Sequence, residues 1–298
     1  MALRVSESQM FFQATRDSNR ARRQLNEATL PLTTQQRVSR PSEDPVVTGR
    51  LSRVQRELSK TGQYSGLVDQ VQTYHTMVES TLGTIGNTVM ELQDLAVQMA
   101  SDNIGPAERS VAAEQVAQLT QSLKMMGNQR QGGRYLFAGR LQNAPPYDSK
   151  LEYQGDEIGR KVMVGDNRTV DGDVVGPDVF GGASTGIKSL FKTAEDFFTA
   201  LKANDVPNIQ AALDELRSGH ERVLSAHVRV GTILTDLDTV ELHHSDTAMT
   251  NEIRESDLIG VDFAKATHDL AFSQSVLEAT IKTTQRVFDA IDIRRFNL

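Results

Sequence analysis

The sequence predicts a mainly α fold: a long antiparallel helical rod or coiled coil built from both ends of the chain, with a small β-rich insertion in the middle. Apolar residues recur at alternating spacings of four and three on both sides of the chain, which is the pattern of helices packed along one face. Glycine and proline instead gather among short β-rich runs between residues 132 and 186. Hydrophobic residues make up 38% of the chain and aromatic residues 5%, with no Trp, which suits extended helical layers better than a globular enzyme of 298 residues.

The first predicted helix occupies residues 4–30, which contain no Pro or Gly and many good helix formers. Its apolar stripe is weak, so the helix needs a partner to be stable. We expect Pro31 to end this helix and residues 31–44 to form a loop. The loop closes on Asp44 followed by Pro45, a helix-start signal in which the carboxylate caps free backbone N–H groups and proline takes the first helical position.

The second predicted helix starts at Pro45, and no further proline occurs before residue 106. Spacings of four and three alternate along its seam, which keeps one face of the helix against a neighbour over several turns. The seam comprises Val71, His75, Val78, Leu82, Ile85, Val89, Leu92, Ala96 and Met99. Gly105 and Pro106 break the helix, and a shorter helix over residues 106–126 follows. So short a link makes these two helices antiparallel.

Residues 132–189 form the predicted insertion, in which the runs RYLFAG, KLEYQG, RKVMVG and RTVDGDVVG are joined by tight turns. Helix resumes after about Ser189 with a second seam. That seam comprises Ile209, Leu213, Leu216, His220, Val223, His227, Val230, Leu234 and Leu237. The last helical run repeats the spacing over Phe263, Thr267, Leu270, Gln274, Leu277, Ile281, Thr284, Phe288 and Ile291. We therefore expect three domains: a terminal coiled coil of residues 1–44 with 263–298, a helical rod of residues 45–131 with 190–262, and the insertion.

No pattern in the sequence predicts a catalytic, cofactor or metal site. The chain has no cysteine, which excludes disulfides, thiolate metal sites and cysteine nucleophiles. His220 and His227 lie seven residues apart, whereas metal ligation usually uses i, i+4 spacing and a third ligand, so we interpret both as core or interface residues. We likewise interpret His243 and His244, close to Asp246, as part of a surface helix turn.

Two loop segments resemble ligand-binding motifs but fail on spacing. FGGASTGIKS, residues 180–189, nearly matches a phosphate-binding loop, but Ile187 separates the glycine and lysine that such a loop needs side by side. We interpret it as a flexible link. The other segment lacks the spacing and the closing glutamate of an EF-hand, so we expect its aspartates to lie in solvated turns. These aspartates are Asp166, Asp171, Asp173 and Asp178.

Charge is distributed unevenly along the chain. The net charge is -7, but residues 1–60 carry 11 Lys and Arg against 6 Asp and Glu, a net +5 that leaves -12 for the remainder. The first helix has a basic cluster without interleaved aromatic residues or glycines, so we favour a solvated or subunit-facing surface over nucleic-acid binding. The cluster comprises Arg16, Arg20, Arg22 and Arg23. No apolar run exceeds four residues, and the N-terminus lacks the apolar core of a cleaved secretory signal.

Three segments resemble the hook-associated branch of the flagellin superfamily. RVSRPSEDP, residues 37–45, resembles the RV-x-x-PS-D-DP segment of that branch, with Glu43 where an aspartate is common. GGRYLFAG, residues 132–139, resembles a second segment, and DLIGVDFAKATHDL, residues 257–270, resembles the C-terminal segment. The chain departs from the family at residues 34–36, where Ser-Thr-Gly-Lys is frequent, so we expect a loop of different shape there.

Three groups of residues become candidates for function. The joint comprises Arg37, Val38, Pro41, Ser42, Glu43, Asp44 and Pro45. The second motif comprises Gly133, Arg134, Tyr135, Leu136, Phe137, Ala138 and Gly139. The assembly seam comprises Phe263, Leu270, Leu277, Ile281, Phe288 and Ile291.

The resemblance implies a structural subunit that forms a short helical zone between hook and filament, after export through the flagellum's own channel. The implied partners are copies of itself in a helical ring, the first hook-associated junction protein, flagellin, and an export chaperone before secretion. It implies an extracellular place in the flagellum without a cleaved signal peptide, and no cofactor, nucleic acid or membrane insertion. A filament flagellin is the alternative, although the ending DAIDIRRFNL lacks the leucine-rich end of filament flagellins. A coiled-coil adaptor would explain the heptads but not the motifs, and every candidate enzyme site fails on spacing.

Overall fold

The computed structural model describes residues 2–38, 40–182 and 185–296, with side chains described from residue 9 to residue 289 within these ranges. About 73% of the structure is helical, which confirms the mainly α fold with a small β insertion. The helices are α1 (Ala2–Thr34), α2 (Pro45–Met99), α3 (Pro106–Gly127), α4 (Gly176–Phe180), α5 (Leu190–Lys202), α6 (Val206–Ile259) and α7 (Phe263–Phe296). Two small antiparallel sheets pair β1 (Arg130–Gln131) with β2 (Arg134–Tyr135) and β3 (Lys161–Gly165) with β4 (Arg168–Asp171).

The chain packs as two units whose boundaries fall inside α2 and α6. The terminal unit contains the residues up to Lys60 and those from Thr247 onward, and the central unit contains Thr61–Asp246. These boundaries are set by packing within the two long helices. The division into three domains at residues 44, 131, 189 and 262 stays a prediction.

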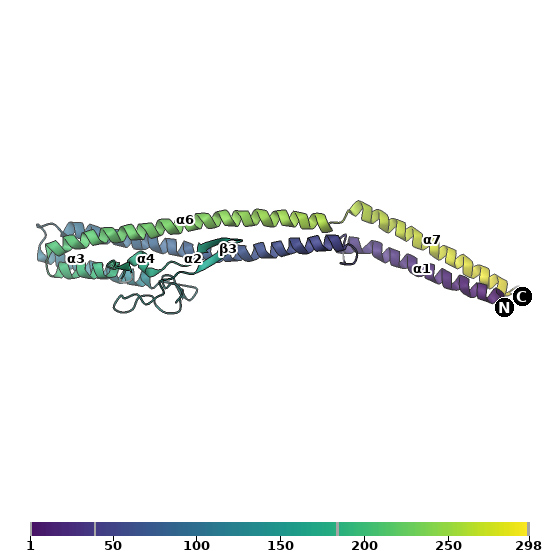
Figure 1. Cartoon of the computed structure of the whole chain (residues 1–298), viewed down its shortest axis with the longest axis horizontal. Helices are drawn as coiled ribbons and strands as arrows, with labels where there is room; N and C mark the ends of the chain where they lie inside the picture. Colours follow the sequence, from purple (N-terminus) through teal and green to yellow (C-terminus); the bar gives the residue numbers. More distant parts are fainter. Residues whose placement is uncertain (1, 39, 183–184, 297–298) are drawn as a thin grey trace. The chain divides into compact units, whose positions relative to one another are not determined.

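In the terminal unit, α1 and α7 run antiparallel and lie side by side (Figure 1). The Phe11 and Phe288 ring centroids are 5.4 Å apart, and Gln36 pairs with Gly260 where α1 ends and α7 begins. Small or polar residues fill the interior of this unit. Among its described side chains, the buried ones are Ala21, Asn251 and Ala266.

Pro31 does not end α1, contrary to the sequence prediction, because the helix continues to Thr34. A proline inside a helix loses one backbone hydrogen bond and crowds the preceding turn. The Thr34 hydroxyl donates to Leu30 O at 2.8 Å, so a side chain satisfies a carbonyl of this last turn. The helix ends where Gln35 takes a positive φ of 57°, a common way for a helix to stop.

In the central unit, α2 and α6 form the core along the predicted seams. Every residue of the predicted α2 seam, from Val71 to Met99, is buried. Along the α6 seam, buried residues alternate with half-buried ones from Ile209 to Leu237. Each fully buried Leu, Ile or Val side chain stabilises the fold by about 1.5–3 kcal/mol, so these seams dominate the stability of the unit.

The insertion contains less β structure than the sequence predicts. RYLFAG contributes only Arg134 and Tyr135 to a strand. In KLEYQG, Tyr153 forms a single bridge with Tyr147, which precedes that run. Stacked and edge-on aromatic rings hold the segment instead, with centroid separations of 4.7, 4.8, 5.3 and 5.5 Å. These rings belong to Phe137, Tyr147, Phe180 and Phe191.

The β3–β4 hairpin packs on both long helices of the central unit. Val164 and Val170 share an apolar cluster with Val68 and Val71 of α2 and with Leu237 of α6. A hairpin this short is marginal alone, so its burial against the helices fixes it.

Candidate functional site

Among the described residues, no three His, Asp or Glu side chains gather in a way that suits a metal ion. In the same ranges no helix is long and apolar enough to cross a membrane. The candidates are therefore the joint, the second motif and the surface of the terminal helices.

The joint starts α2 with the cap that the sequence predicts. Asp44 Oδ1 accepts a hydrogen bond from Val47 N at 3.0 Å, and Pro45 is the first residue of the helix. Just before it, Glu43 N donates to Arg40 O at 3.0 Å, and Arg40 N donates to Glu43 Oε2 at 3.1 Å. The glutamate side chain therefore spans a turn that leads directly into the capped helix.

Arg37 ties the joint to the end of α6. Its backbone N–H donates to Ile259 O at 2.8 Å, and its guanidinium donates to Leu258 O at 3.2 Å. These carbonyls lie at the C-terminus of α6, where the helix dipole favours a cation. The same guanidinium lies 4.0 Å from the Asp44 carboxylate. One arginine thus connects the end of α6 with the start of α2.

The α6–α7 turn is as tightly defined as the joint. Gly260 N donates to Ser256 O at 2.6 Å, and a Cβ at Gly260 would lie 2.5 Å from that same oxygen, so this position requires glycine. Asp262 then caps α7 by accepting from Lys265 N at 3.1 Å. The Gln36–Gly260 bridge joins the two capped turns.

The other joint residues face outward to different degrees. Val38 is half-buried, whereas Pro41 and Ser42 are exposed. The internal contacts of the joint are thus made by its charged residues and its backbone, and the proline and serine remain on the surface.

The second motif is a hairpin followed by buried residues. Gly132 and Gly133, at φ of 56° and 85°, form the two-residue turn between β1 and β2, which needs positive φ at both positions. Leu136, Phe137 and Ala138 are then buried. Gly139 also has a positive φ, and a Cβ there would collide with the Asp156 carbonyl.

Two tyrosines that the sequence analysis did not single out hold the backbone of the second motif. Tyr74 donates to Leu136 O at 2.7 Å and accepts from Val174 N at 2.8 Å. Tyr153 donates to Phe137 O at 3.0 Å. Burial raises the pKa of both hydroxyls, to about 12 for Tyr153, so both remain donors at neutral pH. The motif therefore fixes the insertion to α2 from inside the fold.

The assembly seam of α7 is only partly covered in the single chain. Leu270, Leu277 and Phe288 are half-buried, whereas Phe263 and Ile281 are 54% and 37% exposed. Ile291 lies outside the residues whose side chains the structure describes. The seam therefore presents apolar side chains that α1 does not cover.

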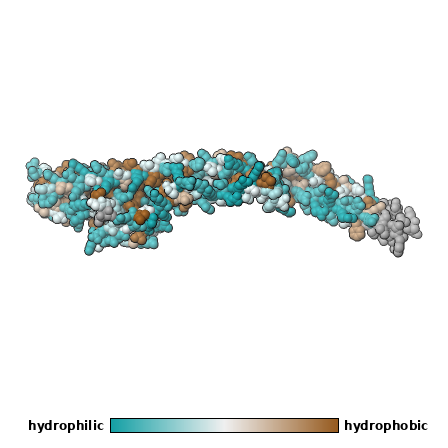
Figure 2. Space-filling model, viewed as in Figure 1, coloured by the Kyte–Doolittle hydropathy of each residue, from teal (hydrophilic) through white to brown (hydrophobic). Residues whose placement is uncertain are grey.

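The terminal helices also share an apolar groove of about 510 Å³, lined on one side by Met10 and Ala14 and on the other by Val276 and Val287. Elsewhere the visible face of the molecule is mostly hydrophilic, with scattered hydrophobic residues (Figure 2). Other large apolar side chains of these helices are exposed as well, namely Phe11, Phe12 and Phe272. Such a set is typical of a surface that another protein covers.

Two interpretations of polar residues are wrong. Asp173 does not lie in a solvated turn: it is buried and accepts hydrogen bonds from Arg160 N at 3.0 Å and Gln142 Nε2 at 2.9 Å. His244 does not lie on the surface either, because it is buried, with Nε2 2.7 Å from Val164 O of β3. In both cases the partners come from distant parts of the sequence.

Residues of the other near-motifs form structural contacts. Lys188, the lysine of the glycine-rich segment, pairs with Asp196 and Glu215, at 2.6 Å each. Asp178 pairs with Arg229 at 2.7 Å. These contacts are exposed ion pairs that contribute at most about 1 kcal/mol each.

Comparison with known proteins agrees with this architecture. Residues 5–142 match the model of the bacterial flagellin N-terminal helical region. The chain is 23% identical over 303 residues to flagellar hook-associated protein 3 of Salmonella typhimurium LT2, covering 94% of this chain and 96% of that protein.

Solved structures share the fold. A protein of Vibrio parahaemolyticus described as a flagellar hook-associated protein aligns with a TM-score of 0.68 at 18% identity, covering 73% of this chain and 100% of that one. The flagellar junction protein FlgL of Legionella pneumophila aligns with a TM-score of 0.59 at 14% identity, covering 70% and 99%. The chain is thus similar to the flagellin N-terminal helical region over residues 5–142, and to flagellar hook-associated protein 3 over 94% of its length.

Proposed function

We propose that this chain is the structural subunit of the zone between the flagellar hook and the filament, and that it has no catalytic role. One observation carries the proposal. The described side chains of the terminal unit include no large buried apolar residue, yet its two helices expose Met10, Phe12, Phe263 and Phe272. Helices with so little internal packing gain their stability from neighbours, as a subunit of a helical assembly requires.

The predicted domains fit this role. Residues 1–44 with 263–298 form the inner layer, where copies of the chain pack in a helical ring. Residues 45–131 with 190–262 form a rod that folds within each subunit. Residues 132–189 form the outer part, whose second motif holds it on α2 through the Tyr74 hydroxyl.

A junction subunit contacts different proteins at its two ends. The first hook-associated junction protein lies below it and flagellin above it, and an export chaperone covers the terminal helices before secretion to the extracellular flagellum. Its upper surface must prefer flagellin over another copy of itself, and a hundredfold preference needs about 3 kcal/mol. A filament flagellin, which the match to the flagellin N-terminal region also supports, has the opposite preference.

Two experiments test the proposal. Disruption of the gene should leave hooks on cells that secrete flagellin but carry no filament. The purified chain should stay monomeric under conditions in which flagellin extends seeded filaments, add to hook ends that carry the first junction protein, and then permit flagellin growth. Long homopolymers of the chain alone would support the filament subunit instead.

A further inference from the structure

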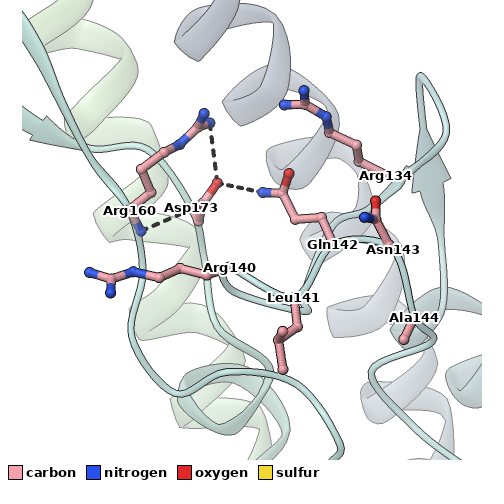
Figure 3. Close-up of a pocket in the computed structure, with 8 residues that line it drawn as sticks. All are labelled: Arg134, Arg140, Leu141, Gln142, Asn143, Ala144, Arg160 and Asp173. Carbon is pink, nitrogen blue, oxygen red and sulfur yellow. Dashed lines mark hydrogen bonds and ion pairs between the residues drawn. The ribbon is translucent and has the colours of Figure 1, made fainter.

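A hollow of about 490 Å³ opens beside the second motif and is rich in arginine. Arg134 comes from β2, Arg140 from the loop after the motif, and Arg160 from the segment just before β3. Figure 3 shows these side chains around Asp173, with Gln142 on the opposite side of the carboxylate from Arg160. The hollow lies entirely within the central unit.

The carboxylate in this hollow is already satisfied. The Asp173 side chain is 1% exposed, and its oxygens accept from Arg160 N at 3.0 Å and Gln142 Nε2 at 2.9 Å. The Arg160 guanidinium lies 3.5 Å from the same carboxylate and balances its charge. Asp173 therefore holds the wall of the hollow together and offers little negative charge to a ligand.

The other two guanidinium groups have no anionic partner. Within the parts of the chain that the structure describes, neither the Arg134 nor the Arg140 side chain makes a hydrogen bond or ion pair, and both residues are exposed. Two uncompensated positive charges thus face one concave surface. The planar guanidinium fork matches a carboxylate, which it binds through two parallel hydrogen bonds. Leu141, the residue after Arg140, also lines the hollow and is 56% exposed, so it adds an apolar contact.

The same chain carries a complementary acidic surface. No Lys or Arg occurs between Lys60 and Arg109, whereas this stretch contains six Asp and Glu. Four of these carboxylates are exposed on the last turns of α2, the following turn and the start of α3, and none has a hydrogen bond or ion pair within the described ranges. We call them the acidic turn: Glu91, Asp94, Asp102 and Glu108.

We propose that the arginine hollow of one subunit binds the acidic turn of a second copy of this chain. The inference rests on the proposed function, in which copies pack side by side. The hollow and the acidic turn are different surfaces of the same chain. Each copy can therefore bind one neighbour through its hollow and a second neighbour through its acidic turn. Such a heterologous contact generates a ring or a helix rather than a closed dimer.

The absence of cysteine from the chain gives a direct test. A variant carrying Asn143→Cys in the hollow and Val97→Cys beside Asp94 keeps all the charges that the proposal uses. It is expressed in cells that lack the gene, and isolated hook and filament assemblies are oxidised. We expect a ladder of disulfide-linked oligomers on a non-reducing gel, and no ladder from the control pair Asn143→Cys with Leu224→Cys.

Charge reversal separates a binding role from a folding role. Adding Arg134→Glu and Arg140→Glu to the cysteine variant should lower the yield of linked oligomers at least tenfold. Adding Glu91→Lys and Asp94→Lys to the same chain should restore it, because the attraction is then re-created with opposite signs. A merely misfolded hollow would not be rescued.

The outcomes also separate this contact from the proposed function. Normal filaments with no ladder, or a ladder that charge reversal leaves unchanged, would overturn the contact and leave the junction role standing. Filaments on cells that lack the gene would overturn the junction role, and the contact with it.

Discussion

Replacing Arg109 by methionine tests what holds the turn between α2 and α3. Arg109 is only 2% exposed, and its guanidinium donates to three uncharged oxygens. Nε donates to Met99 O at 3.1 Å, and the terminal nitrogens donate to Ser101 O at 2.8 Å and to the side-chain oxygen of Asn204. One side chain therefore joins the end of α2 to the turn between α5 and α6.

The expected loss follows from these three bonds. Hydrogen bonds to a charged group contribute about 1.5–3 kcal/mol each, and the Met99 carbonyl at the end of α2 has no helical partner to replace the guanidinium. The Ser101 carbonyl also accepts from Ile104 N at 3.2 Å, so its loss lies at the low end of this range. Methionine keeps most of the apolar stem and removes a buried charge that lacks a carboxylate, which returns roughly 1 kcal/mol or more. With all three bonds at the low end of that range and about 1 kcal/mol returned, we expect Arg109→Met to lower the free energy of unfolding of the central unit by about 3–4 kcal/mol.

Tyrosine fluorescence can follow this unit alone during guanidinium unfolding. The chain has no Trp, and its five tyrosines all lie in the central unit, at positions 64, 74, 135, 147 and 153. Arg217→Met is the matched control, because that side chain is 59% exposed and only pairs with Asp214 at 3.3 Å, so its removal should change stability by less than about 0.5 kcal/mol. A loss below about 1 kcal/mol for Arg109→Met, or one equal to the control, would refute the bonding argument.

Three further changes test other parts of the structure. Burial lowers the pKa of His75, so on acidification the imidazole is protonated in the unfolded chain before it is protonated in the folded one. Stability should therefore be complete above pH about 6.5 and fall below it. His75→Leu should make the guanidinium unfolding midpoint much less dependent on pH between pH 7 and 5. Phe137→Ala, which empties a fully buried site, should cost about 3–5 kcal/mol in the same assay, and a cost near zero would contradict the role of the second motif. Leu277→Asp on α7 should leave the tyrosine-detected midpoint unchanged while cells fail to grow filaments, whereas a shifted midpoint would place this residue in the core of the subunit.

Periodic and local features of this fold are readable from the sequence. The seam from Val71 to Met99 is buried throughout, because a 3.5-residue repeat specifies one helix face wherever the partner lies. The Asp44 cap is equally local, since its acceptor and the Val47 donor are three residues apart. Such features depend only on nearby residues.

Contacts between distant segments could not be predicted in this way. Asp173 looks like a loop carboxylate, and only the fold places Gln142 and Arg160 against it. Arg109 resembles any surface arginine of a helix until Asn204, 95 residues later, is brought to it. Pro31 shows that a single proline does not by itself predict where a helix ends. The helix loses one backbone hydrogen bond there, but it continues to Thr34 because the following residues still favour helix.

The two units differ in what stabilises them. The central unit buries complete seams and an aromatic cluster, so its stability is internal. In the terminal unit, the joint holds α1 and α7 by a few backbone bonds and an exposed Arg37–Asp44 pair at 4.0 Å, worth less than about 1 kcal/mol. These contacts set the direction in which each helix leaves its turn without supplying the burial that would keep it folded alone. Substitutions in the core of the central unit should therefore shift the guanidinium unfolding midpoint. Substitutions of the exposed apolar side chains on the terminal helices should instead reduce assembly and leave that midpoint nearly unchanged.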